Sequence, residues 1–489
     1  MKYKEKISTI KYYGRYMSKL PSIKNQFPEW YQEVIHQAEL VDQSPVRGTM
    51  VIRPYGYAIW ENIKEILDRR IKETGHENAA FPLFIPESFI KKEAEHVAGF
   101  APELAVVTHA GGKELEEPLV VRPTSETMIH YMFARWIKSW RDLPLKINQW
   151  ANVVRWEMRP RAFLRTTEFF WQEGHTAHAT QQEAEEEVML MLQEYVNLAQ
   201  NYLAIPVIAG EKTPTERFPG AVKTMTFEAL MQDGKALQMG TSHLLSQKFA
   251  ESFHIEFQDK EGKLAMPYLT SWGVTTRLIG AVVMVHGDER GLVIPPKIAP
   301  IQVVIIPILK KNMDNTTVLT AAQHIKNELQ SKGIRVFLDE DEHKTPGTKF
   351  YKWELRGVPV RIEIGPRDVE NNQAVVADRI DLSKESVALN TIVPHVEQLL
   401  ERVQKELFDR AVARQKAMWH KDAKLAEFGP ILEEHNGIYQ TGWCGDAACE
   451  AELKRYKAFT RCLIQEKTFD TCFNCTKPSI GDVLVAKAY

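Results

Sequence analysis

Cysteine is almost missing from this chain of 489 residues, and none precedes Cys444. That distribution argues against a secreted protein built on disulfide bonds. No segment reaches the ~20 consecutive apolar residues that a transmembrane helix requires, and the longest apolar run, 300–309, has the length of a strand. The basic N-terminal residues lack the apolar stretch of a signal peptide. We therefore expect a cytoplasmic protein that does not associate with a membrane.

The chain also lacks an excess of charge of either sign. It has 62 Lys and Arg against 64 Asp and Glu, which gives a net charge of −2. This balance neither requires nor excludes a nucleic-acid partner, because a local basic face is sufficient to bind RNA. The GxxxxGK[ST] sequence of P-loop proteins is absent, so a bound nucleotide would not be held by that motif.

Changes in residue pattern divide the chain into three predicted domains. Residues 1–295 mix helices with apolar strands, which indicates an α+β domain on an antiparallel sheet. After the proline-rich segment 293–300, residues 299–395 alternate strands and helices, as in a small α/β domain with a mainly parallel sheet. Residues 396–489 contain most of a charged linker helix, expected at 391–421, and a small α/β domain that carries every cysteine.

Three polar clusters interrupt the apolar strands of the first domain. Arg155 and Glu157 lie two residues apart on the expected strand 145–157, so both should point from one face of the sheet. The other clusters are Trp171, Glu173 and His175 in WQEGH, and Thr275 and Arg277 at a strand-to-helix transition. Each cluster alone could be an ion pair on a half-buried sheet. Three on neighbouring strands favour a concave polar site, because unpaired charge facing a core is costly.

Two arginines, carboxylates and aromatic rings on a sheet suit nucleotidyl transfer. When a carboxylate attacks the α-phosphate of ATP, charge builds on the phosphate oxygens, and fixed guanidinium groups stabilise it. A carboxylate such as Glu157 can hold Mg²⁺ on the phosphates. A second arginine can stack on adenine.

The most specific feature of the chain is an ordered series of motifs. The segments GTMVIRPYGYAIWENIKEILDRR and ENAAFPLFIP, then VVRWE with the loop MRPRAFLRTTEFF, and then GVTTRLIGAVVMVHGDERGLVIPP resemble the three motifs of class II aminoacyl-tRNA synthetases. RPTSE, EFFWQEGHTAH and QMGTSH resemble the prolyl-tRNA synthetase family, of the type shared by archaea, eukaryotic cytoplasm and some bacteria. The resemblance covers nearly the whole chain. It implies a homodimeric ligase that activates L-proline with ATP and joins it to tRNA(Pro).

Site residues follow from this resemblance, motif by motif. It implies a proline pocket of Thr124, Glu126, Arg155, Trp171, Glu173, His175 and His243. It implies an ATP site of Arg155, Glu157, Arg165, Thr166, Gln238, Thr241, Thr275 and Arg277, in which Arg155, Glu157 and Arg277 are catalytic. Arg155 would contact both the proline carboxylate and the α-phosphate, and Arg277 would lie against adenine. The two histidines could instead be structural, and Thr124 or Ser125 could cap the following helix.

Two departures and one omission qualify the resemblance. Thr167 stands where the family usually has arginine, which leaves open any phosphate or tRNA contact there, and Glu289 stands where aspartate is commoner. The segment 176–237 is too short for the editing insertion of some bacterial relatives. One methylene is worth only ~1–3 kcal/mol in a pocket, so alanine and cysteine should be imperfectly rejected. We predict that the chain does not hydrolyse Ala-tRNA.

The second domain resembles the anticodon-binding domain of the same subgroup. Glu354, Arg361, Arg367 and Asp368 match the positions that read the guanines of a UGG-type anticodon. Their chemistry suits this task, since carboxylates accept hydrogen bonds from the N1 and N2 edge of guanine and arginine donates to O6 and N7. Taken singly, each could be an ordinary surface charge.

Two short cysteine pairs lie in the C-terminal tail. Cys444 with Cys449 and Cys472 with Cys475 can supply four thiolates to a tetrahedral Zn²⁺, which would be structural because no position is left for water. Four reduced thiols without metal are the alternative. Cys462 lies in an apparent helix and is expected to be a buried free thiol. The resemblance also implies that the carboxylate of Tyr489 folds back toward the active site.

Two other functions remain open. A sister class II synthetase, for threonine or glycine, would share the three motifs, but RPTSE, WQEGH and QMGTSH speak against it. A regulatory paralogue with the same fold and no ligase activity would be expected to lose Arg155, Glu157 or Arg277, and all three are present.

Overall fold

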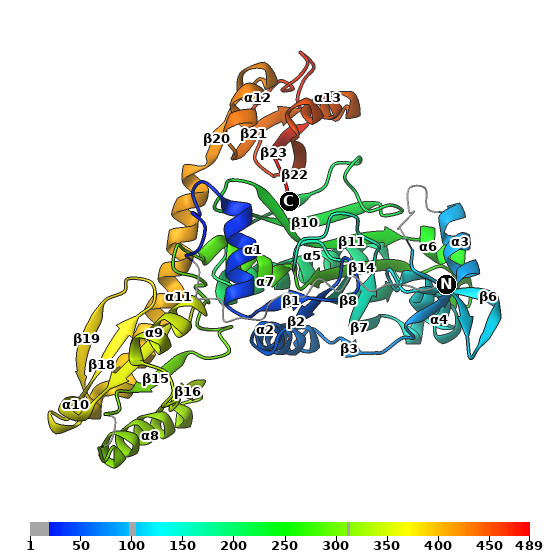
Figure 1. Cartoon of the computed structure of the whole chain (residues 1–489). Helices are drawn as coiled ribbons and strands as arrows, with labels where there is room; N and C mark the ends of the chain where they lie inside the picture. The colour runs from blue at the N-terminus through cyan, green and yellow to red at the C-terminus, as the bar shows by residue number, and fades with distance from the viewer. Residues whose placement is uncertain (1–18, 97–103, 311–312) are drawn as a thin grey trace, which may run out of the picture.

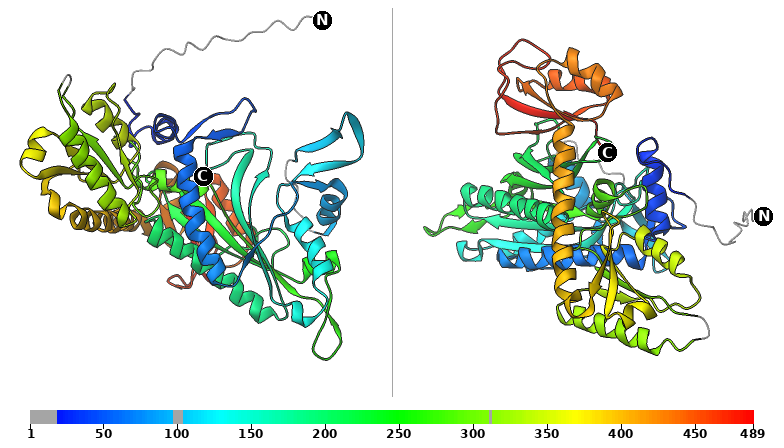
Figure 2. Two further views of the ribbon diagram at one scale, coloured as in Figure 1. Left: turned by 90° about the horizontal axis from the view of Figure 1, so that it is seen from below. Right: turned by 90° about the vertical axis from the view of Figure 1, so that its left-hand side faces the viewer.

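The computed structural model describes residues 19–96, 104–310 and 313–489. Its largest part is built on a central sheet, a second part on a separate sheet, and a third part continues the central sheet (Figure 1). The long helix α11 (Ile392–Ala417) runs along one side of the molecule from the second part to the third (Figures 1 and 2). The predicted linker helix is therefore present.

An antiparallel sheet forms the middle of the molecule. Its strands lie in the order β9 (Val207–Glu211), β10 (Lys223–Leu230), β11 (Ala236–Ser246), β14 (Tyr268–Thr275), β8 (Glu168–His178) and β7 (Leu145–Val154). Every neighbouring pair in this series is antiparallel. The short strand β3 (Glu77–Asn78) adds a parallel edge to β7. The predicted antiparallel catalytic sheet is confirmed.

Helix α5 (Gln181–Asn197) packs on this sheet. It begins at a capping box in which Thr180 and Glu183 bond each other's backbone N–H groups. Its buried apolar residues follow the helical spacing and contact β10, β11 and β14; they are Ala184, Val188, Met191, Leu192 and Tyr195. Burying each large apolar side chain contributes ~1.5–3 kcal/mol, so this face holds the helix to the sheet. A π turn at Leu198–Tyr202 extends the helix.

Further helices and small sheets surround the central sheet. The first motif contains helix α2 (Pro54–Glu73), and α1 (Phe27–Gln37) buries Trp30 completely. The first motif also contains the short strand β4 (Phe84–Pro86). The remaining elements of this part are β1 (Val41–Gln43), β2 (Met50–Ile52), α3 (Glu87–His96), β5 (Val106–Ala110), β6 (Lys113–Val121), α4 (Glu126–Trp136), α6 (Lys248–Phe253), β12 (Phe257–Gln258), β13 (Leu264–Ala265) and α7 (Arg277–His286).

The second part is a small α/β unit. Its strand order is β16 (Val336–Leu338), β15 (Val303–Pro307), β17 (Val360–Ile364), β18 (Gln373–Asp378) and β19 (Lys384–Ala388). The first three strands are parallel and the last two are antiparallel. Every residue of β15 is buried, which explains its continuous apolar sequence. Its helices are α8 (Thr316–Ser331), α9 (Pro346–Leu355) and α10 (Pro366–Glu370).

The C-terminal part extends the central sheet. Its strands are β20 (Trp419–Lys421), β21 (Ile438–Trp443), β22 (Phe459–Leu463) and β23 (Gly481–Ala486), and its helices are α12 (Leu425–Glu434) and α13 (Ala447–Ala451). Strand β22 pairs with β9 through the single position Leu463↔Glu211, so one sheet of 11 strands crosses both parts. The sequence did not predict this continuity.

Cys462 lies on strand β22, so the prediction of a helix around it was wrong. The preceding helical turn Glu452–Tyr456 ends at Lys457, whose backbone is left-handed with φ 55°. The segment after it, Phe459–Leu463, is then a strand. The side chain of Cys462 is buried and free, as expected.

No helix among the described residues is both long enough and apolar enough to cross a membrane. The predicted limits of the three domains stay a prediction, and the limit at 395/396 falls in the first turn of α11.

Candidate active site

A cavity of about 520 Å³ opens on the central sheet. This volume lies within the range of small-molecule sites. The residues predicted for proline and ATP all line it; they are Thr124, Glu126, Arg155, Glu157, Arg165, Thr166, Trp171, Glu173, His175, Gln238, Thr241, His243, Thr275 and Arg277. The structure therefore brings together the whole predicted set, although their individual roles stay predictions.

Strand alternation explains which side chains reach the cavity. On β11, Thr241 and His243 line it, whereas Ser242 between them donates a hydrogen bond to the carbonyl of Val188 on α5. On β8, Glu173 and His175 line it, whereas Gln172 accepts a hydrogen bond from Tyr195 of the same helix. One face of the sheet thus carries α5 and the other carries the site.

The cavity has a closed end. The residues predicted to bind proline, apart from Arg155, are no more than 9% exposed: Thr124, Glu126, Trp171, Glu173, His175 and His243. Their low exposure contrasts with Arg165, whose side chain is 58% exposed at the open end. A small ligand at the closed end would be almost fully removed from water.

A buried ion pair lies at this closed end. Glu173 Oε2 lies 3.0 Å from His175 Nε2, and Gln149 Nε2 donates to Glu173 Oε1 at 2.8 Å. Burial alone would raise the pKa of Glu173, but the hydrogen bond and charge of His175 outweigh it and lower that pKa. Burial likewise opposes the charge on His175, and Glu173 raises its pKa. Both shifts favour a carboxylate–imidazolium pair.

His243 differs from His175 in that no carboxylate of the described residues is its partner. Its ring nitrogens lie 2.9 Å from the hydroxyls of Thr224 and Thr241, and Phe218 packs against the ring with centroids 4.6 Å apart. Burial lowers the pKa of His243 to about 3, so the ring is neutral at physiological pH. The side chain is both fixed in place and part of the cavity wall.

Arg155 lines the cavity near charged groups of both ends, because the charges of Glu126 and Glu173 act on it and its own charge acts on Arg277, but it is not on a strand. Strand β7 ends at Val154, so the prediction that 155–157 continue the strand was wrong. The backbone N–H of Arg155 donates to the carbonyl of Thr167, and Nε donates to the carbonyl of Pro123 at 2.9 Å. Its guanidinium carbon lies 5.4 Å from the ring centre of Trp171, within cation–π range. These contacts hold the guanidinium at the cavity wall.

The open end carries two more charged side chains that face one another. Arg165 Nε lies 3.7 Å from Glu157 Oε2, and Glu157 Oε1 accepts from the backbone N–H of Arg159. Arg277, at the start of α7, donates to the carbonyls of Leu164 and Gln238 at 3.3 and 3.0 Å. Burial, helped by the charge of Arg165, lowers the pKa of Arg277 to about 10, so it is still charged at pH 7.

The RPTSE segment enters the cavity without a side-chain cap. Ser125 is the N-cap residue of α4 but makes no capping bond, and its hydroxyl accepts from Gln149 instead. Thr124 donates to the carboxylate of Glu126. Ser125 thus occupies the expected N-cap position, but neither its side chain nor that of Thr124 caps the helix; both bond to residues of the site instead.

Thr167 is buried at the back of the second-motif loop. Its exposed fraction is 2%, its backbone N–H donates to the carbonyl of Gly48, and its hydroxyl accepts from the N–H of Glu157. Gly48 has φ 85°, and a Cβ there would lie 2.2 Å from the Thr167 hydroxyl. The threonine thus packs inside the protein.

Sequence reasoning missed several residues of the cavity, of which Lys212 is the most informative. Lys212 lines the cavity at 3% exposure, and its ammonium lies 2.9 Å from Glu228 Oε1. Arg461, from the C-terminal part, donates to Glu228 Oε2 at 2.7 and 3.1 Å. No motif marks these positions, so only the fold could have joined them.

A second, smaller cavity of about 130 Å³ lies on the α/β part. Of the residues predicted to read the anticodon, Glu354 and Arg361 line it, and Arg367 and Asp368 do not. These two lie on α10, where the Asp368 carboxylate accepts from the backbone N–H of Gly365. Two of the four residues thus share one cavity, and their role in tRNA binding stays a prediction.

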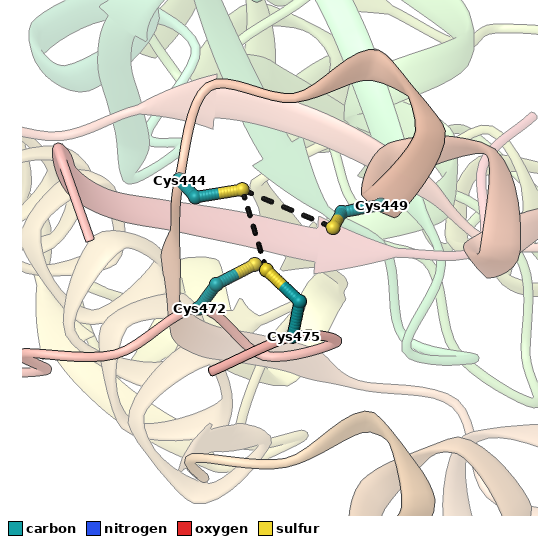
Figure 3. A group of neighbouring side chains, drawn as sticks. All are labelled: Cys444, Cys449, Cys472 and Cys475. Atoms are coloured by element: carbon teal, nitrogen blue, oxygen red, sulfur yellow. Dashed lines mark hydrogen bonds between the residues drawn. The ribbon is translucent and has the colours of Figure 1, made fainter. Parts of the chain in front are cut away.

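The four paired cysteines converge, as Figure 3 shows. Their Sγ atoms all lie within 4.8 Å of one another, with Cys444 at 3.8 Å from Cys449 and 3.7 Å from Cys475. Four thiolates at the Zn–S distance of ~2.3 Å would be separated by about 3.8 Å. Burial opposes ionisation of Cys472, but backbone N–H groups lower its pKa to about 7. The donor set and its spacing fit zinc.

The C-terminal residue packs against the catalytic region. The hydroxyl of Tyr489 donates to Asp233 at 2.7 Å, and its N–H donates to the carbonyl of Ala236. The ring centre lies 5.8 Å from the guanidinium of Arg161, in the loop before Arg165. The ring of Tyr489 therefore lies near the second-motif loop, whereas the approach of its carboxylate to the active site stays a prediction.

Comparison with known proteins agrees with this architecture. Family models match as "tRNA synthetase class II core domain (G, H, P, S and T)" over residues 107–286, "Anticodon binding domain" over 302–399 and "Prolyl-tRNA synthetase, C-terminal" over 425–489. A proline–tRNA ligase of Acetoanaerobium sticklandii is 52% identical over 97% of this chain and 98% of its own. One of Chlorobium phaeobacteroides is 52% identical over 96% and 99%.

Solved structures agree as well. The prolyl-tRNA synthetase of Cryptosporidium parvum, crystallised with L-proline and AMP, is 37% identical, with a TM-score of 0.91 over 97% of this chain and 100% of its own. The cavity, the three matched regions and the full-length identity lead to one conclusion. The chain belongs to the prolyl-tRNA synthetase family of class II aminoacyl-tRNA synthetases.

Proposed function

We propose that the chain activates L-proline with ATP to prolyl-adenylate and pyrophosphate, and then transfers the prolyl group to the 3′ end of tRNA(Pro). The observation that carries this proposal is the cavity in which Arg155 lies near charged groups of both the closed and the open end. A guanidinium there can contact an amino-acid carboxylate on one side and a nucleotide phosphate on the other. The names of the full-length relatives support the same reaction.

Proline would occupy the closed end. Its carboxylate would meet Arg155, and its secondary ammonium would lie beside Thr124 and Glu126. The aromatic wall at Trp171 and His243 would pack the ring, and the Glu173–His175 pair would form part of the floor. Because this end is almost closed to water, it favours a ligand with a small apolar ring, a carboxylate and an ammonium group, as proline has.

MgATP would occupy the open end. The proline carboxylate oxygen attacks the α-phosphorus, a new P–O bond forms, and the bond to the β-phosphate breaks to release pyrophosphate. Arg155 and Arg165 would stabilise the charge that develops on the phosphate oxygens. Glu157 would hold the magnesium ion that ATP brings, and Arg277 would lie against adenine, with Thr166, Gln238, Thr241 and Thr275 completing the wall. In the second step, a terminal ribose hydroxyl of tRNA attacks the proline carbonyl carbon and AMP leaves.

The test is ATP–pyrophosphate exchange with a panel of amino acids. We expect exchange that depends on proline. Exchange that depends on threonine or glycine would instead identify a sister synthetase, and no exchange with any amino acid would identify a paralogue without ligase activity. Arg155→Met should abolish the proline-dependent exchange while the thermal unfolding midpoint is retained.

Selectivity against alanine would be limited. The segment between WQEGH and QMGTSH contains α5, the π turn, β9 and β10 with their loops, and no separate domain. The purified chain is expected to leave Ala-tRNA intact, so that any correction would depend on another protein. Prompt release of alanine from Ala-tRNA by the purified chain would contradict this.

The remaining assignments concern zinc, assembly and location. The four paired cysteines would hold a structural Zn²⁺ that joins the loop at Cys444 to the loop at Cys475, and metal analysis should find one zinc per chain. We also propose a homodimer through the first motif, where the apolar side chains of Val51, Tyr57 and Phe84 are exposed. Light scattering should give twice the mass of the chain. The free cysteines fit a reducing compartment, the cytoplasm.

A further inference from the structure

The small cavity on the α/β part is not formed by that part alone. Arg290, which lines it beside Glu354 and Arg361, belongs to the catalytic region, in the turn that follows α7. Arg290 Nη1 lies 2.9 Å from Glu354 Oε1. The side chain of Arg290 is 54% exposed and that of Glu354 is 18% exposed. A residue of the third motif thus contacts the carboxylate that is expected to read a base.

The turn that carries Arg290 is fixed to the α/β part. Asp288 accepts from both terminal nitrogens of Arg379 at 2.8 Å, a bidentate pair, and Arg379 Nε donates to the backbone carbonyl of Glu354 at 3.0 Å. The N–H of Leu292 donates to the carbonyl of Leu355 at 2.9 Å. Arg379 is only 4% exposed, so its side of this attachment lies inside the protein. Arg290 is therefore held beside Glu354 by its own backbone.

The other cations of the cavity have different partners. Arg361 and Lys384 both contact Glu363, at 2.9 and 2.8 Å, and Arg379 contacts Asp288. Arg290 is the cation whose carboxylate partner is Glu354. Among the described residues, Glu354 Oε2 has no hydrogen-bond donor, so one oxygen is held and the other is left for a ligand.

We infer that Arg290 is a positioning residue for base recognition: it orients the Glu354 carboxylate so that Oε2 meets the N–H groups of an anticodon guanine. Oε1 keeps a second lone pair, so it can accept from the base and from Arg290 together. This inference rests on the proposed tRNA substrate. The third motif, which is expected to place Arg277 at the nucleotide, would thus also provide Arg290 for recognition of the anticodon.

A purely structural role predicts something different. An exposed ion pair contributes ~0–1 kcal/mol to stability, so on that account losing Arg290 would change neither folding nor tRNA binding. The two accounts are separated by the Michaelis constant for tRNA. Proline-dependent pyrophosphate exchange needs no tRNA and reports on the active site alone.

The experiment compares Arg290→Met, Arg290→Lys, Glu354→Gln and the double variant Arg290→Met/Glu354→Gln. Arg455→Met is the matched control, since Arg455 is an exposed arginine in a single ion pair with Glu452. Each protein is assayed for pyrophosphate exchange, and for aminoacylation of tRNA(Pro) transcripts with the natural anticodon and with each anticodon guanine replaced by adenine.

We expect Arg290→Met to raise the KM for tRNA about tenfold, because roughly one charged hydrogen bond is lost. The rate of pyrophosphate exchange should stay within about twofold of the wild type. It should also reduce discrimination between guanine and adenine at one anticodon position. Arg290→Lys should restore part of the affinity. In the Glu354→Gln background the substitution should add little, because the carboxylate that it orients is gone.

Three results would overturn the inference. The first is an unchanged KM for tRNA in Arg290→Met. The second is that Arg290→Met raises this KM equally in the wild-type and in the Glu354→Gln background, and the third is that Arg290→Met loses pyrophosphate exchange together with tRNA affinity. The second would mean that Arg290 binds RNA directly, and the third that it acts on the active site through α7. If instead the wild-type chain failed to charge tRNA(Pro) at all, the proposed function itself would fail.

Discussion

Arg461→Met is expected to loosen the junction between the C-terminal part and the catalytic sheet. Arg461 on β22 donates to Glu228 on β10 at 2.7 and 3.1 Å, and Lys212 bonds the other carboxylate oxygen at 2.9 Å. All three side chains are at least nine-tenths buried. Burial alone would raise the pKa of Glu228, but the two cations outweigh it and lower that pKa.

The size of the effect follows from what each substitution leaves behind. Removing Arg461 deletes two charged hydrogen bonds worth ~1.5–3 kcal/mol each at most, but Glu228 keeps Lys212, so we expect a loss of about 2–4 kcal/mol. Glu228→Gln leaves Lys212 and Arg461 buried with no anion. Breaking a buried pair in this way costs ~3–5 kcal/mol, and here two cations are affected. Glu228→Gln should therefore be the more damaging change.

The assay is native-state hydrogen exchange of the amides of β9 and β22. These strands are paired at one position only. Their local opening therefore depends on the ion pairs of Lys212, Glu228 and Arg461 rather than on a long series of backbone hydrogen bonds between the strands. Strand β17, in the separate sheet, is the internal reference, and Arg455→Met is the control variant. If Glu228→Gln destabilised the junction less than Arg461→Met, the electrostatic reasoning would be wrong.

Three further predictions concern other parts of the chain. A Cβ at Gly174 would lie 2.0 Å from the ring of Trp272, which packs beside Tyr195 on the α5 face of the sheet, so Gly174→Ala should lower the thermal midpoint, at a cost of at least ~1–3 kcal/mol; an unchanged midpoint would contradict the close packing. Burial lowers the pKa of His286 to about 3 in the folded chain, whereas this histidine binds a proton below pH ~6.5 in the unfolded chain. The contribution of His286 to the free energy of unfolding is therefore fully present above pH ~6.5 and falls by about 2 kcal/mol at pH 5. His286→Gln should reduce this loss, as measured by urea unfolding at the two pH values. Cys472→Ser should abolish zinc binding in metal analysis and increase proteolysis within 444–475, and zinc retained at one per chain would show that these cysteines are not its ligands.

The sequence predicted the local features of the site because they depend on local rules. Alternation along β8 placed Trp171, Glu173 and His175 on one face of the sheet, and the resemblance of QMGTSH to the family motif identified His243 on β11. The cysteine pairs could be predicted as one metal site because each pair lies within a single short loop of sequence. The prediction that Arg155 lines the cavity was correct although strand β7 ends at Val154. The reason is that the N–H of Arg155 donates to the carbonyl of Thr167, which continues the hydrogen bonding between the two chain segments by one residue.

The features that sequence reasoning missed depend on residues that are distant in the chain. Lys212, Glu228 and Arg461 meet only because β22 pairs with β9, and a single paired position leaves no pattern in either strand. Arg290 contacts Glu354 only once the α/β part is attached to the third-motif turn. Cys462 was expected in a helix, whereas the left-handed backbone at Lys457 ends the helical turn that precedes it.

The most direct test of the central claim is the identity of the adenylate that this cavity makes. The purified chain is incubated with MgATP and all amino acids at equal concentration, without tRNA, and the enzyme-bound product is identified by mass spectrometry. We expect prolyl-adenylate to dominate, with minor alanyl and cysteinyl products, and to disappear in Arg155→Met. A different dominant adenylate, or prolyl-adenylate formed equally well without the Arg155 guanidinium, would contradict the account.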